Sequence, residues 1–201
     1  MVKIAVDIAL LLPKTIDQIC IDINKKEHAD AFSDLSKSDN HPHITLAMGV
    51  IDEKHIENVN SKLNEIIKRF SKLNLEIISL NYETTPENKK SYGFEIGLTN
   101  KLKELHATIM QELLPMFSYD VKNKMFFLDS DETFNEVSKF WVENYGKKHS
   151  DPENYHPHIS LKCRKAEYPN LPIKFIASKL VLCHLGNYCT CRTILGSHEL
   201  S

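Results

Sequence analysis

The chain has 201 residues, which is enough for one domain with a well-formed core or for two small lobes that share one. Apolar residues make up 42% and charged residues 26%, as in ordinary globular proteins, so a disordered chain is excluded. The formal net charge of −2 provides no overall basic field for long nucleic acid, so a nucleotide partner should be small or a strand end.

The apolar run at the N-terminus predicts a buried strand. It covers residues 3–12 and ends at Pro13, but Asp7 interrupts it and no small-residue cleavage site follows, which argues against a signal peptide. No stretch approaches the roughly 18 apolar residues that are needed to cross a bilayer. We therefore expect a cytoplasmic protein with no membrane partner.

The hydrophobic patterns mix strands with helices along the rest of the chain. In chain order we expect strands at 3–12, 43–51, 73–83, 92–98, 125–128, 173–185 and 190–196, and helices at 15–28, 56–70, 102–114 and 131–145. A polar turn at 86–90 joins two of these strands directly, and Gly186-Asn187 marks a turn between the last two. Paired strands without helical crossovers favour an α+β fold with antiparallel sheets.

The five cysteines are an odd number in a chain too long to depend on disulfides. We therefore expect mostly reduced thiols with structural roles. Cys183, Cys189 and Cys191 lie close together beside His184, which raises the alternative of a zinc site. Their spacing, however, matches no standard set of zinc ligands.

One six-residue segment occurs twice. Residues 41–46 read HPHITL, and residues 156–161 read HPHISL. Each contains apolar residues that suit a buried strand, and a proline whose missing amide hydrogen suits the first residue or the edge of a strand. Because the two segments lie about half a chain apart, the duplication predicts two similar lobes.

Alternation along a strand gives each segment one polar and one apolar face. In the first segment His43 and Thr45 share a face, and the apolar residues between and after them point into the core. In the second segment His158 and Ser160 are placed in the same way. Each strand therefore presents one imidazole and one hydroxyl to a common surface.

Two such surfaces facing each other supply what phosphodiester cleavage requires. One imidazole can take a proton from the nucleophile, and the other can give a proton to the leaving oxygen, because histidine titrates near neutral pH. The hydroxyls can donate hydrogen bonds to the non-bridging phosphate oxygens. This chemistry needs no metal and no cofactor, and we expect neither.

These segments resemble the signature of the 2H phosphoesterase superfamily, which has two His-x-Thr/Ser motifs, each followed by a hydrophobic residue. Residues 43–46 and 158–161 both fit that pattern. The helix after the first motif, the helix in the middle of the chain and the closing hairpin over 180–200 are similar to the layout of its 2′,5′ RNA ligase-like and cyclic nucleotide phosphodiesterase branch.

The resemblance implies a single domain over residues 1–201. Its two pseudo-symmetric lobes would have antiparallel sheets that face a central cleft, with helices on the outside. It also implies a metal-independent phosphodiesterase that opens a 2′,3′-cyclic phosphate or cleaves a 2′,5′ or 3′,5′ linkage in a small nucleotide, oligonucleotide or RNA end.

The same resemblance implies roles for the four polar residues of the motifs. His43 and His158 would be catalytic, with His43 as the general acid for the leaving oxygen and His158 as the base on water. Thr45 and Ser160 would bind the phosphate. Because the two motifs are alike, the acid and base roles exchange if the substrate binds in the opposite direction.

Five further residues are candidate substrate contacts. Lys162 continues the alternation beyond Ser160, as does Arg164, and both could reach a second phosphate, although a solvated strand end fits equally well. His41 and His156 share the same alternation and are expected at the lip of the cleft, where each strand begins.

Tyr155 completes this set, because an aromatic side chain next to the second motif could stack on a nucleobase. Tyr92, Trp141 and Tyr188 are further candidates for stacking, although for each of these residues alone a packing role is the commoner one.

Two alternatives stay open. The His-x-His pairs at 41–43 and 156–158 could chelate zinc or iron, but no carboxylate has matching spacing and a metal leaves the hydroxyls unexplained. The same cleft could instead hold a nucleotide or an RNA end without turnover, although a binding module need not keep both histidines. The sequence indicates no obligate protein partner.

Overall fold

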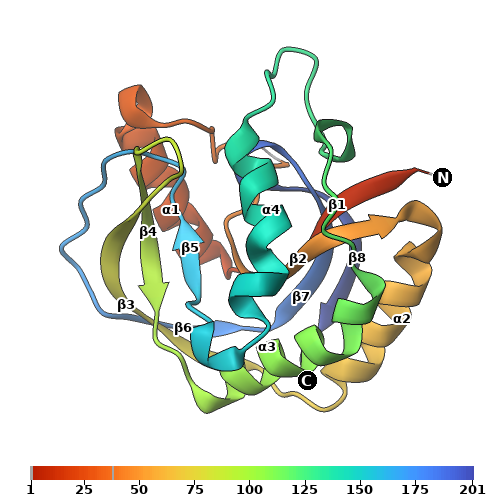
Figure 1. The fold of residues 1–201 in the computed structure, drawn as a ribbon. Helices are drawn as coiled ribbons and strands as arrows, with labels where there is room; N and C mark the ends of the chain where they lie inside the picture. Colours follow the sequence, from red (N-terminus) through yellow and green to blue (C-terminus); the bar gives the residue numbers. More distant parts are fainter. Residues whose placement is uncertain (1, 38) are drawn as a thin grey trace.

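The computed structural model describes residues 2–37 and 39–201, and it folds them into two sheets and four α-helices (Figure 1). The strands are β1 (Lys3–Leu11), β2 (His43–Asp52), β3 (Leu73–Thr84), β4 (Lys90–Ile96), β5 (His158–Ser160), β6 (Ile173–Ala177), β7 (Lys179–Leu185) and β8 (Cys191–Glu199). The helices are α1 (Lys14–Lys26), α2 (Ile56–Ile67), α3 (Asn100–Leu113) and α4 (Glu136–His149). This is the α+β class that the sequence predicts.

Both sheets are antiparallel and have four strands, in the orders β2-β1-β7-β8 and β5-β4-β3-β6. The two motifs begin the edge strands β2 and β5, and each edge strand pairs with one central strand, β1 or β4. The two lobes are therefore built alike around the repeated segment, as expected. Figure 1 shows the first sheet on the right and the second on the left.

One large hydrophobic core joins the lobes, and a smaller cluster lies around the disulfide. Alternate residues of β1, such as Val6 and Ile8, are fully buried in the large core together with Ile44 of β2 and Phe94 of β4. The apolar side chains of the motif strands are thus packed in the core. Because side chains alternate along a strand, the polar residues between them must point away from the core.

Helix α4 comes from the part of the chain between the two motifs. It packs against β2 and, in Figure 1, stands between the two sheets. It also begins at Glu136 rather than at residue 131, because the Asn135 side chain accepts a hydrogen bond from the Val137 amide and caps the helix there. Just upstream, Asp129 and Glu132 instead form ion pairs with the buried Arg192 of β8.

Two strand predictions are wrong in detail. Residues 173–185 do not form one strand: the chain changes sheets at Ser178, so that β6 pairs with β3 and β7 pairs with β1. Residues 125–128 form no strand, and only an isolated bridge joins Phe127 to Gly186. A local apolar pattern cannot show which sheet a strand joins, since both sheets bury one face in the same core.

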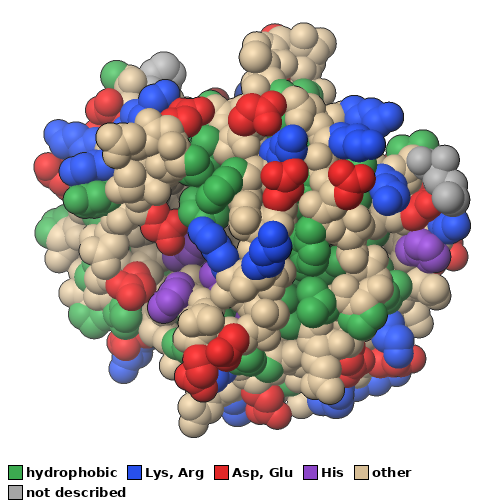
Figure 2. Space-filling model, viewed as in Figure 1, with side chains coloured by type: hydrophobic (Ala, Val, Ile, Leu, Met, Phe, Trp, Pro, Cys, Tyr) green, Lys and Arg blue, Asp and Glu red, His purple; other side chains and the backbone are tan. Residues whose placement is uncertain are grey.

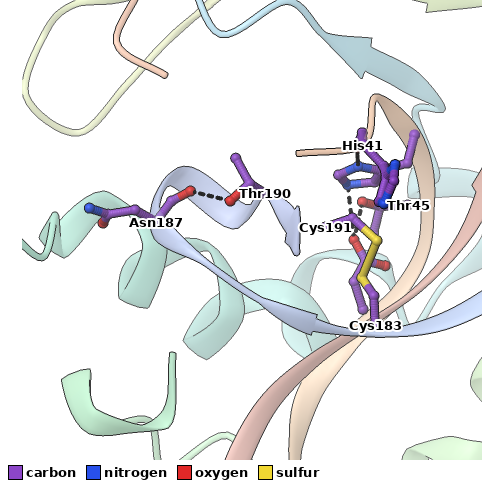
Figure 3. Close-up of a disulfide and its surroundings, with 8 residues drawn as sticks. His41, Thr45, Cys183, Asn187, Thr190 and Cys191 are labelled. Atoms are coloured by element: carbon purple, nitrogen blue, oxygen red, sulfur yellow. Dashed lines mark hydrogen bonds and ion pairs between the residues drawn. A yellow bond between two sulfur atoms is a disulfide. The ribbon is translucent and has the colours of Figure 1, made fainter. Parts of the chain in front are cut away.

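The cysteine prediction is only partly correct. Cys20, Cys163 and Cys189 are free thiols, but Cys183 and Cys191 form a disulfide between β7 and β8. Figure 3 shows this disulfide beside His41 and Thr45. The carbonyl of Cys191 also accepts a hydrogen bond from the His41 amide at 3.1 Å, so the β8 end of the disulfide touches the start of the first motif.

No helix in the described part of the chain is both long enough and apolar enough to cross a membrane.

Asn24 of α1 connects distant parts of the fold. Its buried amide donates to the carbonyls of Leu161 and Ser33 at 2.9 and 3.0 Å, and its oxygen accepts from the Leu35 amide at 3.0 Å. It thereby joins α1 to the end of the second motif and to the segment before the first.

Replacing Asn24 with Ala should lower the free energy of unfolding by about 2–4 kcal/mol, because buried backbone groups lose their partners. Urea denaturation measures this loss. The matched control is Asn58→Ala on the exposed face of α2, which should change stability by less than about 0.5 kcal/mol. Equal effects of the two substitutions would contradict the bridging role of Asn24.

Candidate active site

The two motifs line one cavity of about 170 Å³ between the lobes. His43 and Thr45 reach it from β2, and His158 and Ser160 reach it from β5. We call it the histidine cavity. The structure therefore brings together the four residues that strand alternation singled out.

In each motif, the backbone carbonyl of the first histidine orients the ring of the second histidine. The Nδ1 atom of His43 lies 2.7 Å from the carbonyl oxygen of His41, and Nδ1 of His158 lies 3.1 Å from that of His156. A carbonyl can only accept, so each Nδ1 carries a hydrogen and donates it. Among the described residues, Nε2 of His158 is left without a partner, whereas Nε2 of His43 faces Asp7.

Asp7 lies beneath the first motif, and sequence reasoning missed it. Its Oδ2 accepts a hydrogen bond from the Thr45 hydroxyl at 2.7 Å and lies 3.3 Å from Nε2 of His43. The side chain is fully buried, and its Oδ1 has no hydrogen-bond partner among the described residues. The sequence did contain a signal for this residue, because Asp7 is a single carboxylate within an apolar strand. A charged side chain is buried in such a strand only when it has a partner, so a functional contact could have been expected.

The two hydroxyls have different surroundings. The Thr45 hydroxyl gives its hydrogen to Asp7. The Ser160 oxygen instead accepts from the Lys162 amide at 3.4 Å, so the Ser160 hydrogen is free to point into the cavity. Ser160 is therefore the hydroxyl that is ready to donate to an anion, whereas Thr45 would have to turn away from Asp7 first.

Lys162 lines the cavity and is not at a solvated strand end. Its side chain is 6% exposed, and its Nζ donates to the carbonyl of Tyr188 at 2.6 Å. Burial lowers the pKa of this lysine, and the charges of Cys189 and Asp7 act in the opposite direction. The alternation argument did not apply to it, because β5 ends at Ser160 and the backbone of Lys162 has a φ of 52°.

Two residues near Lys162 also have an unfavourable backbone conformation. Tyr188 and Cys189, which also line the cavity, have φ values of 56° and 53°. The left-handed region is unfavourable for residues other than glycine, so the surrounding contacts must stabilise it. One such contact is the hydrogen bond of 2.6 Å from the Tyr188 amide to the Ser138 hydroxyl.

The other candidate substrate contacts differ in whether they line the cavity and in how exposed they are. His156 is exposed and lines the cavity, whereas His41 is half-buried and lies outside the residues that line it. Tyr155 lines the cavity, but it is buried: its ring stacks on His106 with centroids 3.8 Å apart, and its hydroxyl donates to the Thr45 carbonyl at 2.8 Å. Tyr155 thus positions β2.

Among the aromatic candidates, Trp141 and Tyr188 lie at the histidine cavity together with Phe32, which the sequence did not single out. The rings of Phe32 and Tyr188 are 4.8 Å apart. Tyr92 does not line this cavity. An aromatic group of this kind offers flat surfaces on which a planar ring can stack.

Cations outnumber carboxylates in the described lining of the cavity, although the chain as a whole is slightly acidic. The cations are Lys90, Lys148, Lys162 and Arg164, and the carboxylates are Glu83 and Glu87. Lys148 lies 4.5 Å from the ring centre of Trp141, and Arg164 lies 5.7 Å from that of Phe32. Within the described residues, neither these two cations nor Lys162 forms an ion pair with a carboxylate. Unpaired cations in a concave site favour an anionic ligand.

The described residues contain no group of three or more His, Cys, Asp and Glu side chains arranged to hold a metal ion. Near the cysteines, Nε2 of His184 lies 2.9 Å from the Met125 carbonyl oxygen.

No protein-family model matches this chain, and no curated protein does either. Solved structures do match over its full length. TT0787 of Thermus thermophilus is 13% identical with a TM-score of 0.60, covering 98% of both chains. E. coli LigT in apo form is 14% identical with a TM-score of 0.56, covering 100% of this chain and 99% of LigT.

A further solved structure, described as a phosphoesterase, is 14% identical with a TM-score of 0.55, covering 98% of this chain and 97% of that one. LigT has also been solved in complexes with ATP and with 3′-AMP. This chain thus has the fold of LigT and of the other two solved structures. At this level of identity, the likeness extends to the fold alone.

The hydrogen bonds predict tautomers that can be measured. At a pH where the rings are neutral, His43 and His158 should carry their hydrogen on Nδ1 because each donates to a carbonyl. Long-range ¹⁵N–¹H NMR spectra distinguish the two tautomers. His184 is the internal control, since its contact with Met125 requires a hydrogen on Nε2 instead. A hydrogen on Nε2 of neutral His158 would contradict the assignment.

Proposed function

We propose that this protein is a metal-independent phosphodiesterase that hydrolyses a 2′,3′-cyclic phosphate or a related phosphodiester of a small nucleotide, oligonucleotide or RNA end. The observation that carries the proposal is the convergence of two backbone-held imidazoles and two hydroxyls in one cationic cavity. The nucleotide complexes of LigT, which has the same fold, support a nucleotide as the ligand.

The surroundings of the two histidines favour different roles in the hydrolysis of a cyclic phosphate. Both ring nitrogens of the buried His43 face oxygen acceptors, on His41 and Asp7, so a ring protonated on both nitrogens can satisfy both contacts. His158 is exposed, and its Nε2 has no protein partner among the described residues. We therefore assign His43 as the acid and His158 as the base.

In this mechanism a water molecule gives a proton to Nε2 of His158 as its oxygen forms a bond to phosphorus. The bond between phosphorus and the ring oxygen breaks, and His43 protonates that oxygen. The Ser160 hydroxyl and the Lys162 ammonium stabilise the negative charge on the non-bridging oxygens. The product is a phosphomonoester with one free hydroxyl, and proton exchange with water restores both imidazoles.

The aromatic part of the cavity complements this chemistry. Phe32, Trp141 and Tyr188 can hold the nucleobase, while Lys148 and Arg164, which lie over aromatic rings, can bind further phosphate groups. The cavity thus has separate positions for the base and for the reacting phosphate.

His43→Ala and His158→Ala should each lower the rate of 2′,3′-cyclic AMP hydrolysis by about 10²–10⁴-fold, because each removes one proton-transfer group. The assay contains EDTA, and its control is His55→Ala, a histidine that lies away from the cavity. Loss of wild-type activity in EDTA with recovery on adding zinc would favour a metallohydrolase. Tight binding of the nucleotide without any product would favour a binding module.

Asp7→Asn tests whether the buried carboxylate positions His43 and Thr45. The substitution keeps the shape of the side chain but removes its charge, so kcat should fall by about 10–100-fold while KM changes less than about threefold. Steady-state kinetics separates the two constants, and Asp120→Asn at an exposed position is the matched control. A rise in KM at constant kcat would show that Asp7 acts only in binding.

A further inference from the structure

Helix α3 carries a buried histidine that the proposed reaction does not use. His106 is fully buried and does not line the histidine cavity. In Figure 2, histidine side chains are visible in the left half of the face, whereas the ring of His106 has no exposed surface. A buried imidazole is normally bonded to polar partners, so its contacts indicate what it holds in place.

The ring of His106 lies between two backbone carbonyls from different parts of the fold. Its Nδ1 atom lies 2.8 Å from the carbonyl oxygen of Leu46, which ends the first motif. Its Nε2 atom lies 3.1 Å from the carbonyl oxygen of His149, the last residue of α4. Burial lowers the pKa of His106, although the two carbonyls act in the opposite direction. A neutral ring has a single hydrogen, and the shorter contact, to Leu46, takes it.

The Leu46 carbonyl belongs to a β-bulge in the first motif. Thr45 and Ala47 pair with consecutive residues of β1, so Leu46 between them has no partner on that strand. A bulge redirects the side chains beside it. Thr45 and Met48 both line the histidine cavity, although regular alternation places residues three apart on opposite faces. The direction of the Thr45 side chain relative to the rest of β2 therefore depends on the bulge.

Two stacked rings hold this bulge. The ring of Tyr155 lies on that of His106, with centroids 3.8 Å apart and an angle of 4° between their planes. The Tyr155 hydroxyl donates to the Thr45 carbonyl at 2.8 Å, so the stacked pair binds two neighbouring carbonyls of the first motif. Both side chains are buried, so neither contact is readily replaced by water.

The same stack connects the first motif to the second. Tyr155 immediately precedes the second motif, and His149 ends the helix from which the chain runs towards it. Nδ1 of His149 lies 3.0 Å from the carbonyl oxygen of Asn154, which closes the loop between them. His106 thus lies where the first motif, the end of α4 and the approach to the second motif meet.

From these contacts we propose that His106 is a positioning residue, which fixes the bulge through the Leu46 carbonyl and thereby places His43 and Thr45 relative to the second motif. The inference rests on the proposed phosphodiesterase function and adds a residue that supports its proton transfers. His106 itself acts at a distance from the reacting atoms. A misplacement of about 1 Å can lower a rate by about 100-fold, so a small relaxation of the bulge should change kcat.

Substitution can test the two ring nitrogens of His106 separately. His106→Ala removes both contacts, His106→Asn puts an amide nitrogen near the place of Nδ1, and His106→Gln puts one near the place of Nε2. His106→Ala should lower kcat for 2′,3′-cyclic AMP by about 10–100-fold and change KM less than about threefold. His106→Asn should restore most of kcat through Leu46, whereas His106→Gln, which reaches only His149, should not.

A loss of stability alone would not produce this order. The matched control is His184→Ala, which also removes a ring in contact with a backbone carbonyl, that of Met125, but outside the histidine cavity. It should lower the midpoint of urea denaturation while kcat stays within about twofold of the wild type. The comparison of His106→Asn with His106→Gln holds even if His106→Ala does not fold.

A second readout needs no activity. In long-range ¹⁵N–¹H NMR spectra, the ring signals of His43 should shift in His106→Ala and return towards their wild-type positions in His106→Asn, because this ring follows the bulged strand. If the wild-type protein hydrolyses no cyclic nucleotide, the proposed function fails, and these spectra still test the positioning role.

Three results would overturn the inference while leaving the proposed function in place. The first is a His106→Ala variant with wild-type kcat and unshifted His43 signals. The second is recovery of kcat by His106→Gln as complete as that by His106→Asn. The third is a rise in KM at constant kcat, which would show that His106 affects binding alone.

Discussion

Each motif strand buries apolar side chains on one face while presenting an imidazole and a hydroxyl on the other, and the site depends on this constraint. Ile44 and Ile159 are completely buried behind β2 and β5, so neither strand can turn without exposing its core face. The carbonyl two residues before each catalytic candidate then fixes the ring. Packing sets the direction of each side chain, and one backbone hydrogen bond sets its rotation.

The two halves share this framework but differ in what surrounds the rings. His43 lies over a buried carboxylate, and His158 borders solvent and a second cavity. The carboxylate belongs to β1, and residues of β3 and β4 line much of the second cavity beside His158, so both differences come from strands outside the repeated segment. Two like motifs therefore acquire different surroundings from strands that are not part of the repeat.

The sequence predicts the features that depend on local spacing. Alternation correctly places His43 with Thr45 and His158 with Ser160, because regular strands have a period of two. Lys162 lines the same cavity as expected, but alternation does not explain its position, because the backbone leaves the strand conformation there. Alternation could not find Phe32 or the second cavity beside His158, because these depend on how strands distant in sequence pair and on where a loop folds back. The sheet change at Ser178 was hidden for the same reason.

Helix α4 comes from the part of the chain between the two motifs, yet it supplies one wall of the histidine cavity, including Val137, Trp141 and Lys148. This wall is connected to neither motif by strand pairing. Substitutions on a single helical face can thus alter the size and charge of the binding space while both imidazoles and both hydroxyls keep their places. Proteins that share this framework can diverge in ligand preference through one helix, with their proton-transfer groups unchanged.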